Sequence, residues 1–206
     1  MSYSHLWDRL REQDPDHSVR YAQRWRDLAA QGHDLDGEAR FVDAMAPRGS
    51  RILDAGCGTG RVGGYLAAAG HDVVGVDLDD YLIADARETY PSADWHVGDL
   101  ARFDFSTVGA GFDIIVSAGN VMTFLDPHSR HRVMANLAGA LAADGRLVSG
   151  FGAGRGYEFA DYEADLRAAG LQPAISFSTW NLHPFTPGSG FLVCVAQRAG
   201  AQQEER

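Results

Sequence analysis

The sequence predicts an α/β protein of three layers, in which a mostly parallel sheet is doubly wound between helices on both faces. From Ser50 onward, short apolar runs alternate with helical segments of about ten residues, the pattern of βαβ crossovers. The last two apolar runs have no helix between them, so they should form an antiparallel hairpin at one edge of the sheet. A chain of 206 residues, 45% apolar and 22% charged, suits one globular domain.

The first 49 residues contain no strand-like run, and we expect them to form a helical cap on the main domain. Ser18 is expected to cap one helix and Asp36 another, which ends before Pro47. This segment is too short to bury a core of its own. The expected organisation is a cap over 1–49, a main domain over 50–198 and a frayed, disordered tail over 199–206.

Seven strands and four helices are expected after the cap. Short apolar runs indicate the strands, and segments whose apolar residues recur every three or four positions indicate the helices. The strands are predicted at 51–55, 72–77, 94–97, 112–117, 146–151, 171–179 and 190–196. The helices are predicted at 61–69, 79–90, 127–142 and 157–169. A turn at Asp144-Gly145 is expected to introduce the fifth strand.

Charge and cysteine usage exclude several classes of partner. The net charge of −10 argues against a nucleic-acid partner, because duplex binding needs several Lys and Arg side chains. No apolar run approaches the roughly 18 residues of a membrane span, and residues 1–30 lack the apolar core of a signal peptide. Cys57 and Cys194 have no zinc spacing, and the histidines form no metal constellation. We therefore expect a cytoplasmic monomer or homodimer without a metal, membrane or nucleic-acid partner.

The segment ILDAGCGTGR carries the most specific signal, since it runs from a strand into Gly56, Gly58 and Gly60 and then into a helix. Glycines there let the backbone turn sharply and let a ligand approach closely. The literal match Gly58-x-Gly60-x-x-Gly63 keeps an NAD(P)-dependent oxidoreductase open as an alternative. Asp54 argues against it, because a carboxylate before the loop repels a pyrophosphate and attracts an ammonium group.

Two further acids follow the next two predicted strands. Asp77 stands about 20 residues after the first glycine, the offset of a carboxylate that accepts ribose hydroxyls. Asp99 can accept a hydrogen bond from an adenine amine, with Leu78 or Leu100 beside the ring. Together with Asp54, these acids require a ligand with an ammonium, a ribose diol and an adenine but no phosphate. S-adenosylmethionine (SAM) has these groups.

The pieces LDAGCGTG, VVGVDLD, GDL, FDIIVSAGNVMTFL and LAADGRLV occur in this order, and with them the sequence resembles the class I SAM-dependent methyltransferases. The resemblance implies a seven-stranded sheet of order 3-2-1-4-5-7-6 with strand seven antiparallel. It also implies that SAM lies over the carboxyl ends of strands one to four. The segment SAGNVMTF lacks the Asn-Pro-Pro-aromatic motif of enzymes that methylate amino groups of adenine and glutamine, which disfavours those acceptors.

By position, the resemblance assigns residues to each part of the cofactor. They are Asp54, Gly56, Cys57, Gly58 and Gly60 on the methionine side, Asp77 at the ribose, Leu78, Asp99 and Leu100 at the adenine, and Ala118 and Gly119 near the sulfonium. Tyr21 and Arg24 of the cap are candidates for the SAM carboxylate, through a hydroxyl and a bidentate guanidinium. An ordinary surface role for these two residues is equally open.

The acceptor side has weaker signals, and no catalytic residue is assigned. Asn120 and Phe124 follow the fourth strand, and Arg155 in the second glycine cluster, GFGAGRGY, suits an anionic group. Trp180 and His183 lie between the last two strands, and His183 is a candidate base. We expect a methyltransferase that uses SAM for in-line transfer to a small acceptor, and the sequence leaves open whether that acceptor is anionic. A SAM-binding module without catalysis also stays open.

Overall fold

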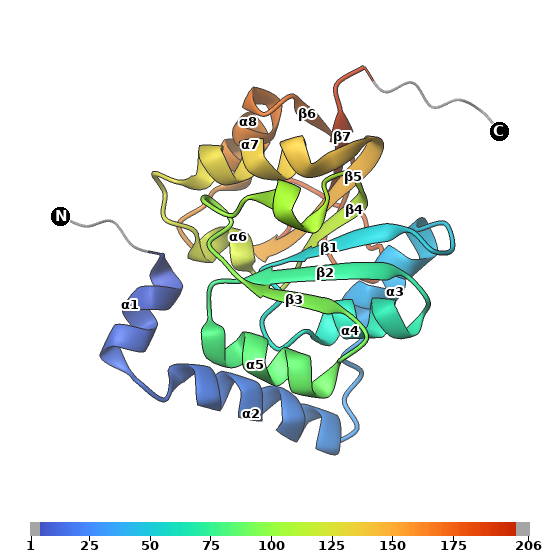
Figure 1. The fold of residues 1–206 in the computed structure, drawn as a ribbon. Coiled ribbons are helices and arrows are strands. Elements are labelled where there is room, and N and C mark those ends of the chain that lie inside the picture. The colour runs from blue at the N-terminus through green and yellow to red at the C-terminus, as the bar shows by residue number, and fades with distance from the viewer. Residues whose placement is uncertain (1–4, 201–206) are drawn as a thin grey trace.

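The computed structural model describes residues 5–200 and places one seven-stranded sheet between two layers of helices (Figure 1). The strands are β1 (Arg51–Ala55), β2 (Asp72–Asp77), β3 (Asp94–Val97), β4 (Phe112–Ser117), β5 (Leu141–Gly152), β6 (Leu171–Phe177) and β7 (Phe191–Arg198). Their order is β3-β2-β1-β4-β5-β7-β6, and β7 runs antiparallel to both of its neighbours. Both the fold class and the predicted terminal hairpin are confirmed.

The helices divide between the two faces of the sheet (Figure 1). Below it in this view lie α3 (Gly37–Met45), α4 (Arg61–Ala68) and α5 (Asp80–Thr89), and above it lie α7 (Arg130–Ala140) and α8 (Phe159–Ala168). Helices α1 (Leu6–Gln13) and α2 (His17–Ala30) come from the N-terminal segment, and α2 packs on the outer side of α5. Two short elements, η1 (Phe105–Val108) and α6 (Val121–Phe124), were not predicted.

Each face of the sheet has its own apolar core. Ile115 of β4 lies in the core that α7 and α8 cover, whereas Ile114 lies in the core shared with α3 and α4. This alternation follows from the period of two along a strand. Burying one such side chain stabilises the fold by about 1.5–3 kcal/mol. Because helices cover both faces of β4, apolar residues at successive positions of the strand are all buried, which explains its continuous apolar run.

The beginning of α2 differs from the prediction. The helix starts at His17 after Asp16, and the Ser18 side chain does not cap it. Instead the Ser18 hydroxyl donates to the buried carboxylate of Asp79, at the start of α5. A tertiary hydrogen bond has taken the place of the predicted local one.

The boundary between α7 and β5 also differs from the prediction. The helix predicted over 127–142 ends at Ala140, and Asp144, expected in a turn, lies within β5. The reason is that Leu141 pairs with Phe112 of β4, so the backbone already belongs to the sheet there. Helix α7 begins at Arg130, three residues after the predicted start, and β5 begins at Leu141, five residues before its predicted start. The other predicted bounds agree to within two residues. Of the predicted tail, residues 201–206 lie outside the described part of the chain.

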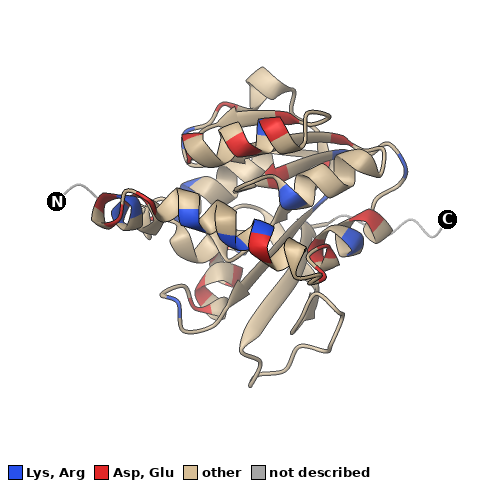
Figure 2. Cartoon of the chain, turned by 90° about the horizontal axis from the view of Figure 1, so that it is seen from below, with Lys and Arg blue, Asp and Glu red and all other residues tan. Residues whose placement is uncertain are grey.

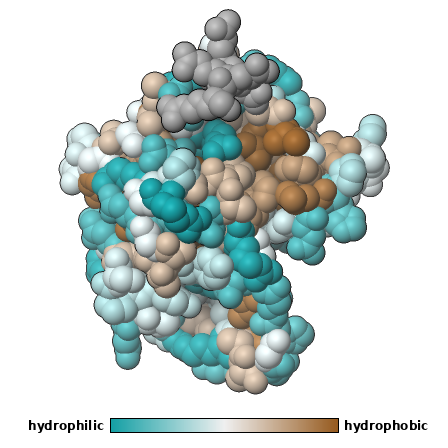
Figure 3. All heavy atoms as spheres, turned by 90° about the vertical axis from the view of Figure 1, so that its right-hand side faces the viewer, coloured by the Kyte–Doolittle hydropathy of each residue, from teal (hydrophilic) through white to brown (hydrophobic). Residues whose placement is uncertain are grey.

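The surface carries mixed charge and little clustered apolar area. Figure 2 shows basic and acidic positions interspersed along the helices of the underside. Figure 3 shows hydrophobic residues gathered in one area of a face that is otherwise largely hydrophilic. Among the described residues, no helix is long and apolar enough to cross a membrane.

Candidate functional site

The loop between β1 and α4 turns on three glycines with a left-handed backbone. Gly56, Gly58 and Gly60 have φ angles of +80°, +54° and +76°, values at which other residues are strained. A Cβ on Gly56 would lie 2.5 Å from the Val121 methyl groups, and one on Gly60 would lie 2.8 Å from the Trp95 ring. Both conformation and space therefore require glycine in this loop.

Asp54 lies in β1 beneath this loop and is only 2% exposed. Its Oδ2 accepts a hydrogen bond of 2.8 Å from the backbone N–H of Gly63 in α4. Burial raises the pKa of Asp54 to about 7, against the opposing effects of the Gly63 N–H and of Arg61. The carboxylate thus ties the first strand to the first crossover helix and changes its charge near neutral pH.

Asp77 ends β2 on the other side of the loop. Its two oxygens accept hydrogen bonds of 2.9 Å from the backbone N–H groups of Gly58 and Asp79. Each carboxylate oxygen has a further lone pair that can accept from a hydroxyl. Burial raises the pKa of Asp77 to about 6. This residue therefore joins the glycine loop to the start of α5.

Asp99 follows β3 and is held by a histidine of the N-terminal segment. Asp99 Oδ1 accepts from the backbone N–H of Ala101 at 2.8 Å and lies 3.2 Å from His5 Nε2. His5 Nδ1 accepts from the backbone N–H of Asp126 at 3.1 Å, so Nε2 carries the proton and donates to Asp99. The next residue, Leu100, is buried in the main core. The sequence analysis did not assign His5 a role at Asp99.

Trp7 anchors the N-terminal helices to the same edge of the sheet. Its indole N–H donates to Asp79 Oδ2 at 2.7 Å, and its ring packs edge-on against Tyr21 and Phe124. Leu78 belongs to this cluster. Phe124, which was predicted on the acceptor side, therefore lies beside Leu78 in the structure.

A cavity of about 30 Å³ opens at the carboxyl ends of β1 and β4. It is lined by Tyr21, Trp25, Asp54, Gly56, Cys57, Thr59, Arg61, Val62, Ala118 and Gly119. The Tyr21 ring lies over Gly58, where a Cβ would sit 3.5 Å from Tyr21 Cε1. Burial raises the pKa of Tyr21 and raises that of Cys57 well above its ordinary value, so both groups stay protonated at neutral pH. Cys57 is therefore no thiolate nucleophile in this environment.

Arg61 lines this cavity, whereas Arg24 does not. The Arg61 guanidinium pairs with Glu38 at 2.9 Å and lies 4.6 Å from the centre of the Trp25 ring. Arg24 is exposed and forms no hydrogen bond or ion pair within residues 5–200. Arg24 was predicted because its guanidinium could form a bidentate pair with the SAM carboxylate, but no local sequence signal shows which arginine faces the cavity.

Three residues predicted on the acceptor side lie together at the carboxyl end of β5. Asn120 has a left-handed φ of +68°, and its Oδ1 accepts from the backbone N–H of Gly152 at 2.8 Å. A Cβ on Gly152 would lie 3.1 Å from Arg155 Nε, and one on Gly150 would lie 2.2 Å from Trp180 Cζ2. Arg155 and Trp180 thus cover alternate glycines of one strand.

Arg155 and His183 are both exposed, and they differ in their partners. Arg155 has no hydrogen bond or ion pair within the described chain. The His183 backbone is fixed, since its carbonyl accepts from the Ser178 N–H at 2.8 Å. Within residues 5–200, the imidazole of His183 makes no hydrogen bond or ion pair that would orient it as a base.

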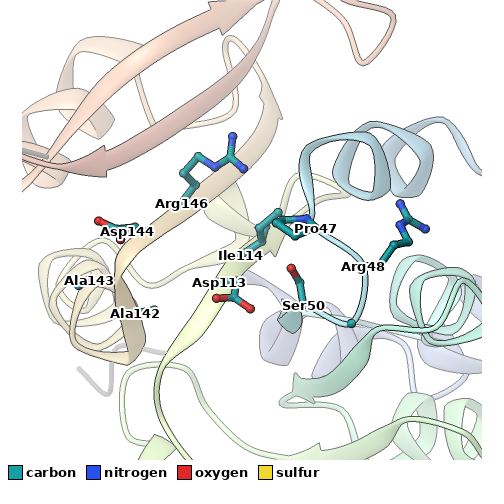
Figure 4. Close-up of a pocket in the computed structure, with 10 residues that line it drawn as sticks. Pro47, Arg48, Ser50, Asp113, Ile114, Ala142, Ala143, Asp144 and Arg146 are labelled. Atoms are coloured by element: carbon teal, nitrogen blue, oxygen red, sulfur yellow. The ribbon is translucent and has the colours of Figure 1, made fainter. Parts of the chain in front are cut away.

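A larger groove of about 550 Å³ lies at the opposite edge of the sheet, where β1, β4 and β5 begin (Figure 4). Two of its charged side chains already have partners. Arg146 donates to the carbonyl of Met45 at 2.7 Å, and Asp113 accepts from the backbone N–H of Arg51 at 2.8 Å. The groove is therefore a weaker candidate than the acid-lined edge. Over residues 5–200, no three His, Cys, Asp or Glu side chains are grouped to hold a metal ion.

Comparisons with known proteins agree with this geometry. The family model described as a methyltransferase domain matches residues 52–145. The crystal structure of a TehB-like SAM-dependent methyltransferase from Corynebacterium glutamicum is 54% identical, with a TM-score of 0.87. That likeness covers 90% of this chain and 100% of the other.

Two curated relatives each match about half of the chain. Ribosomal RNA small subunit methyltransferase C of Chromohalobacter salexigens is 34% identical over 121 residues, which are 55% of this chain and 36% of that protein. The dTDP-3-amino-3,4,6-trideoxy-alpha-D-glucopyranose N,N-dimethyltransferase of Streptomyces venezuelae is 30% identical over 105 residues, which are 51% of this chain and 42% of that protein. The chain thus spans about two fifths of the length of these relatives.

Proposed function

Because the chain belongs to the class I SAM-dependent methyltransferases, we propose that it transfers the methyl group of SAM, in line, to a small acceptor that carries an anionic group. The family membership replaces the NAD(P)-dependent oxidoreductase as the explanation of the glycine loop. When bound, SAM supplies a methyl group on a sulfonium centre. The residues of the chain must then bind both partners, align them and exclude water.

The donor and acceptor groups at the strand ends fit SAM chemically. Asp54 lines the cavity and suits the ammonium group, and Asp77 keeps lone pairs for the ribose hydroxyls. Asp99, oriented by His5, suits the adenine amine. Small residues at the start of the segment after β4, such as Ala118, leave room at the sulfonium.

The carboxylate of SAM is assigned to Arg61 and Tyr21 in place of Arg24. Both line the cavity, and together they offer a planar cation and a neutral hydroxyl donor. The glycine loop adds no free donor there, because the N–H groups of Gly56, Gly58 and Gly60 already donate within the protein. Arg61 thus replaces Arg24 as the positively charged partner of the SAM carboxylate, and Tyr21 keeps its predicted place.

The cavity must enlarge before it can hold the cofactor. At about 30 Å³ it is far below the roughly 300–1,000 Å³ of ordinary ligand sites. Tyr21 and Trp25 of α2 form one of its walls, so we infer that α1 and α2 move outward on binding. Their return over the bound cofactor would exclude water from the transfer.

The proposal that the acceptor is anionic rests on Arg155. It is an exposed guanidinium without a partner, in a glycine-rich loop beside Asn120. An unpaired cation of this kind binds a carboxylate or phosphate group through charge-assisted hydrogen bonds. The Streptomyces venezuelae relative is named for a dTDP-linked sugar, an anionic small molecule, which supports this class. The relative named for ribosomal RNA favours a different acceptor, and the net charge of −10 opposes it here.

The proposal is tested by following labelled methyl from SAM into a panel of small acceptors. The variant Arg155→Ala should raise the KM of an anionic acceptor about tenfold while SAM affinity stays constant. Arg132→Ala is a matched control, because Arg132 is also exposed and unpaired within the described chain. An equal loss of SAM and acceptor binding in the Arg155 variant would refute the assignment. SAM binding without label transfer to any acceptor would favour the module without catalysis.

A further inference from the structure

Trp180 lies directly on the backbone of β5. Gly150 is buried, and three atoms of the six-membered ring of the Trp180 indole lie within 3.1 Å of where its Cβ would be. Any larger residue at this position would displace the indole. Gly150 of β5 thus leaves the space that the indole of Trp180, in the loop between β6 and β7, occupies.

This contact stands next to the wall of the SAM cavity. Ser117 of β4 pairs with Ser149 of β5, so Ala118 and Gly150 are the next residues along two adjacent strands. Such strands lie about 4.8 Å apart. The backbone N–H of Asn120 donates to the Gly150 carbonyl at 3.3 Å, which keeps the two chain segments together. Since Ala118 lines the cavity, Trp180 lies on the strand next to the cavity wall.

The indole is held from one side and is accessible from another. Phe41 of α3 packs edge-on against it, with ring centres 5.8 Å apart. Trp180 is only partly buried, and its indole N–H donates to no residue of the described chain. A buried tryptophan normally finds a partner for this group. Both a ring surface and a hydrogen-bond donor therefore remain for a ligand.

Arg155 covers the next glycine on the same face of β5, Gly152. Two positions along a strand are about 6.6 Å apart, so the guanidinium and the indole lie within reach of one small molecule. We propose that Trp180 and Arg155 together select a planar aromatic acid as the methyl acceptor, with its ring against the indole and its acidic group at the guanidinium. This inference rests on the proposed function and narrows its substrate class from anionic to aromatic and anionic.

The test compares two acids with the same carbon skeleton and the same polar substituents, one with a planar aromatic ring and one with a saturated ring. Binding of 4-hydroxybenzoate and of trans-4-hydroxycyclohexanecarboxylate is measured by calorimetry with S-adenosylhomocysteine present, so that no turnover is needed. The wild-type protein should bind the aromatic acid about tenfold more tightly, the size of a good aromatic contact. Trp180→Leu should reduce this preference to about twofold or less, and Trp180→Phe should keep part of it.

Gly150→Ala gives a second route to the same result, because its Cβ would displace the indole without removing it. Gly139→Ala is the matched control, since nothing lies within 4 Å of a Cβ there. The affinity for S-adenosylhomocysteine should stay constant in all variants, and thermal unfolding checks that each one folds. Should Trp180→Leu not fold, Trp180→Phe and Gly150→Ala decide the question.

Three outcomes would overturn the inference: equal binding of the two acids, binding of neither, or an unchanged preference in the folded Trp180 and Gly150 variants. Labelled methyl transfer to anionic acceptors without a planar preference would reject this inference and leave the proposed function intact. Tight binding of the aromatic acid with no methyl transfer to any anionic acceptor would have the opposite meaning, because the proposed function alone would then fail.

Discussion

The glycines at 56–60 and those at 154 and 156 both stand between a strand and a helix, yet their surroundings differ. In the first cluster, a Cβ on Gly56 or Gly60 would lie 2.5–2.9 Å from neighbouring side chains. In the second, Gly154 and Gly156 also have positive φ angles, but nothing lies within 4 Å of a Cβ on either. A packed loop suits a binding site of fixed shape, and an open loop suits a site whose shape can adapt to its ligand.

The largest expected effect comes from Gly60→Ala, compared with Gly154→Ala. At Gly60, left-handed strain and the contacts with Trp95 and Ala86 add, and together they should lower the free energy of unfolding by about 2–5 kcal/mol. At Gly154 the strain acts alone and should cost about 1–2 kcal/mol. Denaturant unfolding of both variants measures the difference. Equal losses would show that the two loops are packed alike.

The second prediction concerns the charge on Asp54. Its pKa is about 7 in the folded protein and 3.8 in its ordinary state, so the folded state holds a proton that the unfolded state loses. The resulting stability is present below pH 3.8 and is lost as the pH rises through about 7. An ammonium ligand favours the ionised form, so SAM affinity should rise from pH 5.5 to about 8.

The variant Asp54→Asn removes this titration. It should weaken SAM binding by about tenfold or more at pH 8 and flatten the pH dependence, because an amide attracts the ammonium less. Asp77, whose pKa is about 6, titrates nearby, so some slope should persist below pH 6. Calorimetry at several pH values measures both effects. An unchanged affinity in Asp54→Asn would show that this carboxylate only holds α4 through Gly63.

Residues at the strand ends were easier to predict from the sequence than the tertiary contacts that side chains form near those ends. Asp54 and Asp77 were found because parallel strands bring their carboxyl ends to one edge of the sheet. Ser18 was misplaced because its hydrogen bond to Asp79 joins two helices that are distant in sequence. Trp180 was predicted on the acceptor side from its place between the last two strands. Its contact with Gly150 depends on strand register, which no local pattern encodes.

The third prediction concerns which arginine binds the SAM carboxylate, Arg61 or Arg24, and its expected effect on affinity is smaller than the two effects above. Arg61→Ala should lower SAM affinity about tenfold, since it removes a charged partner of the carboxylate, whereas Arg24→Ala should change it by less than about twofold. Binding of 5′-methylthioadenosine, which lacks the amino-acid part, should be unaffected in both variants. Equal losses for the two ligands in Arg61→Ala would indicate that its pairing with Glu38 only supports the fold.

The smallest expected effect belongs to Gly152→Ala, at the end of β5 just before the open glycines. Its Cβ would lie 3.1 Å from Arg155 Nε and 3.6 Å from Asn120 Oδ1, and the exposed Arg155 side chain can move aside. The free energy of unfolding should therefore change by no more than about 0.5 kcal/mol. The acceptor KM should rise a few-fold because the guanidinium is displaced, and SAM affinity should stay constant. A loss of stability as large as that of Gly60→Ala would mean that Arg155 is locked in place, and a locked guanidinium would be a fixed part of the acceptor site from the start.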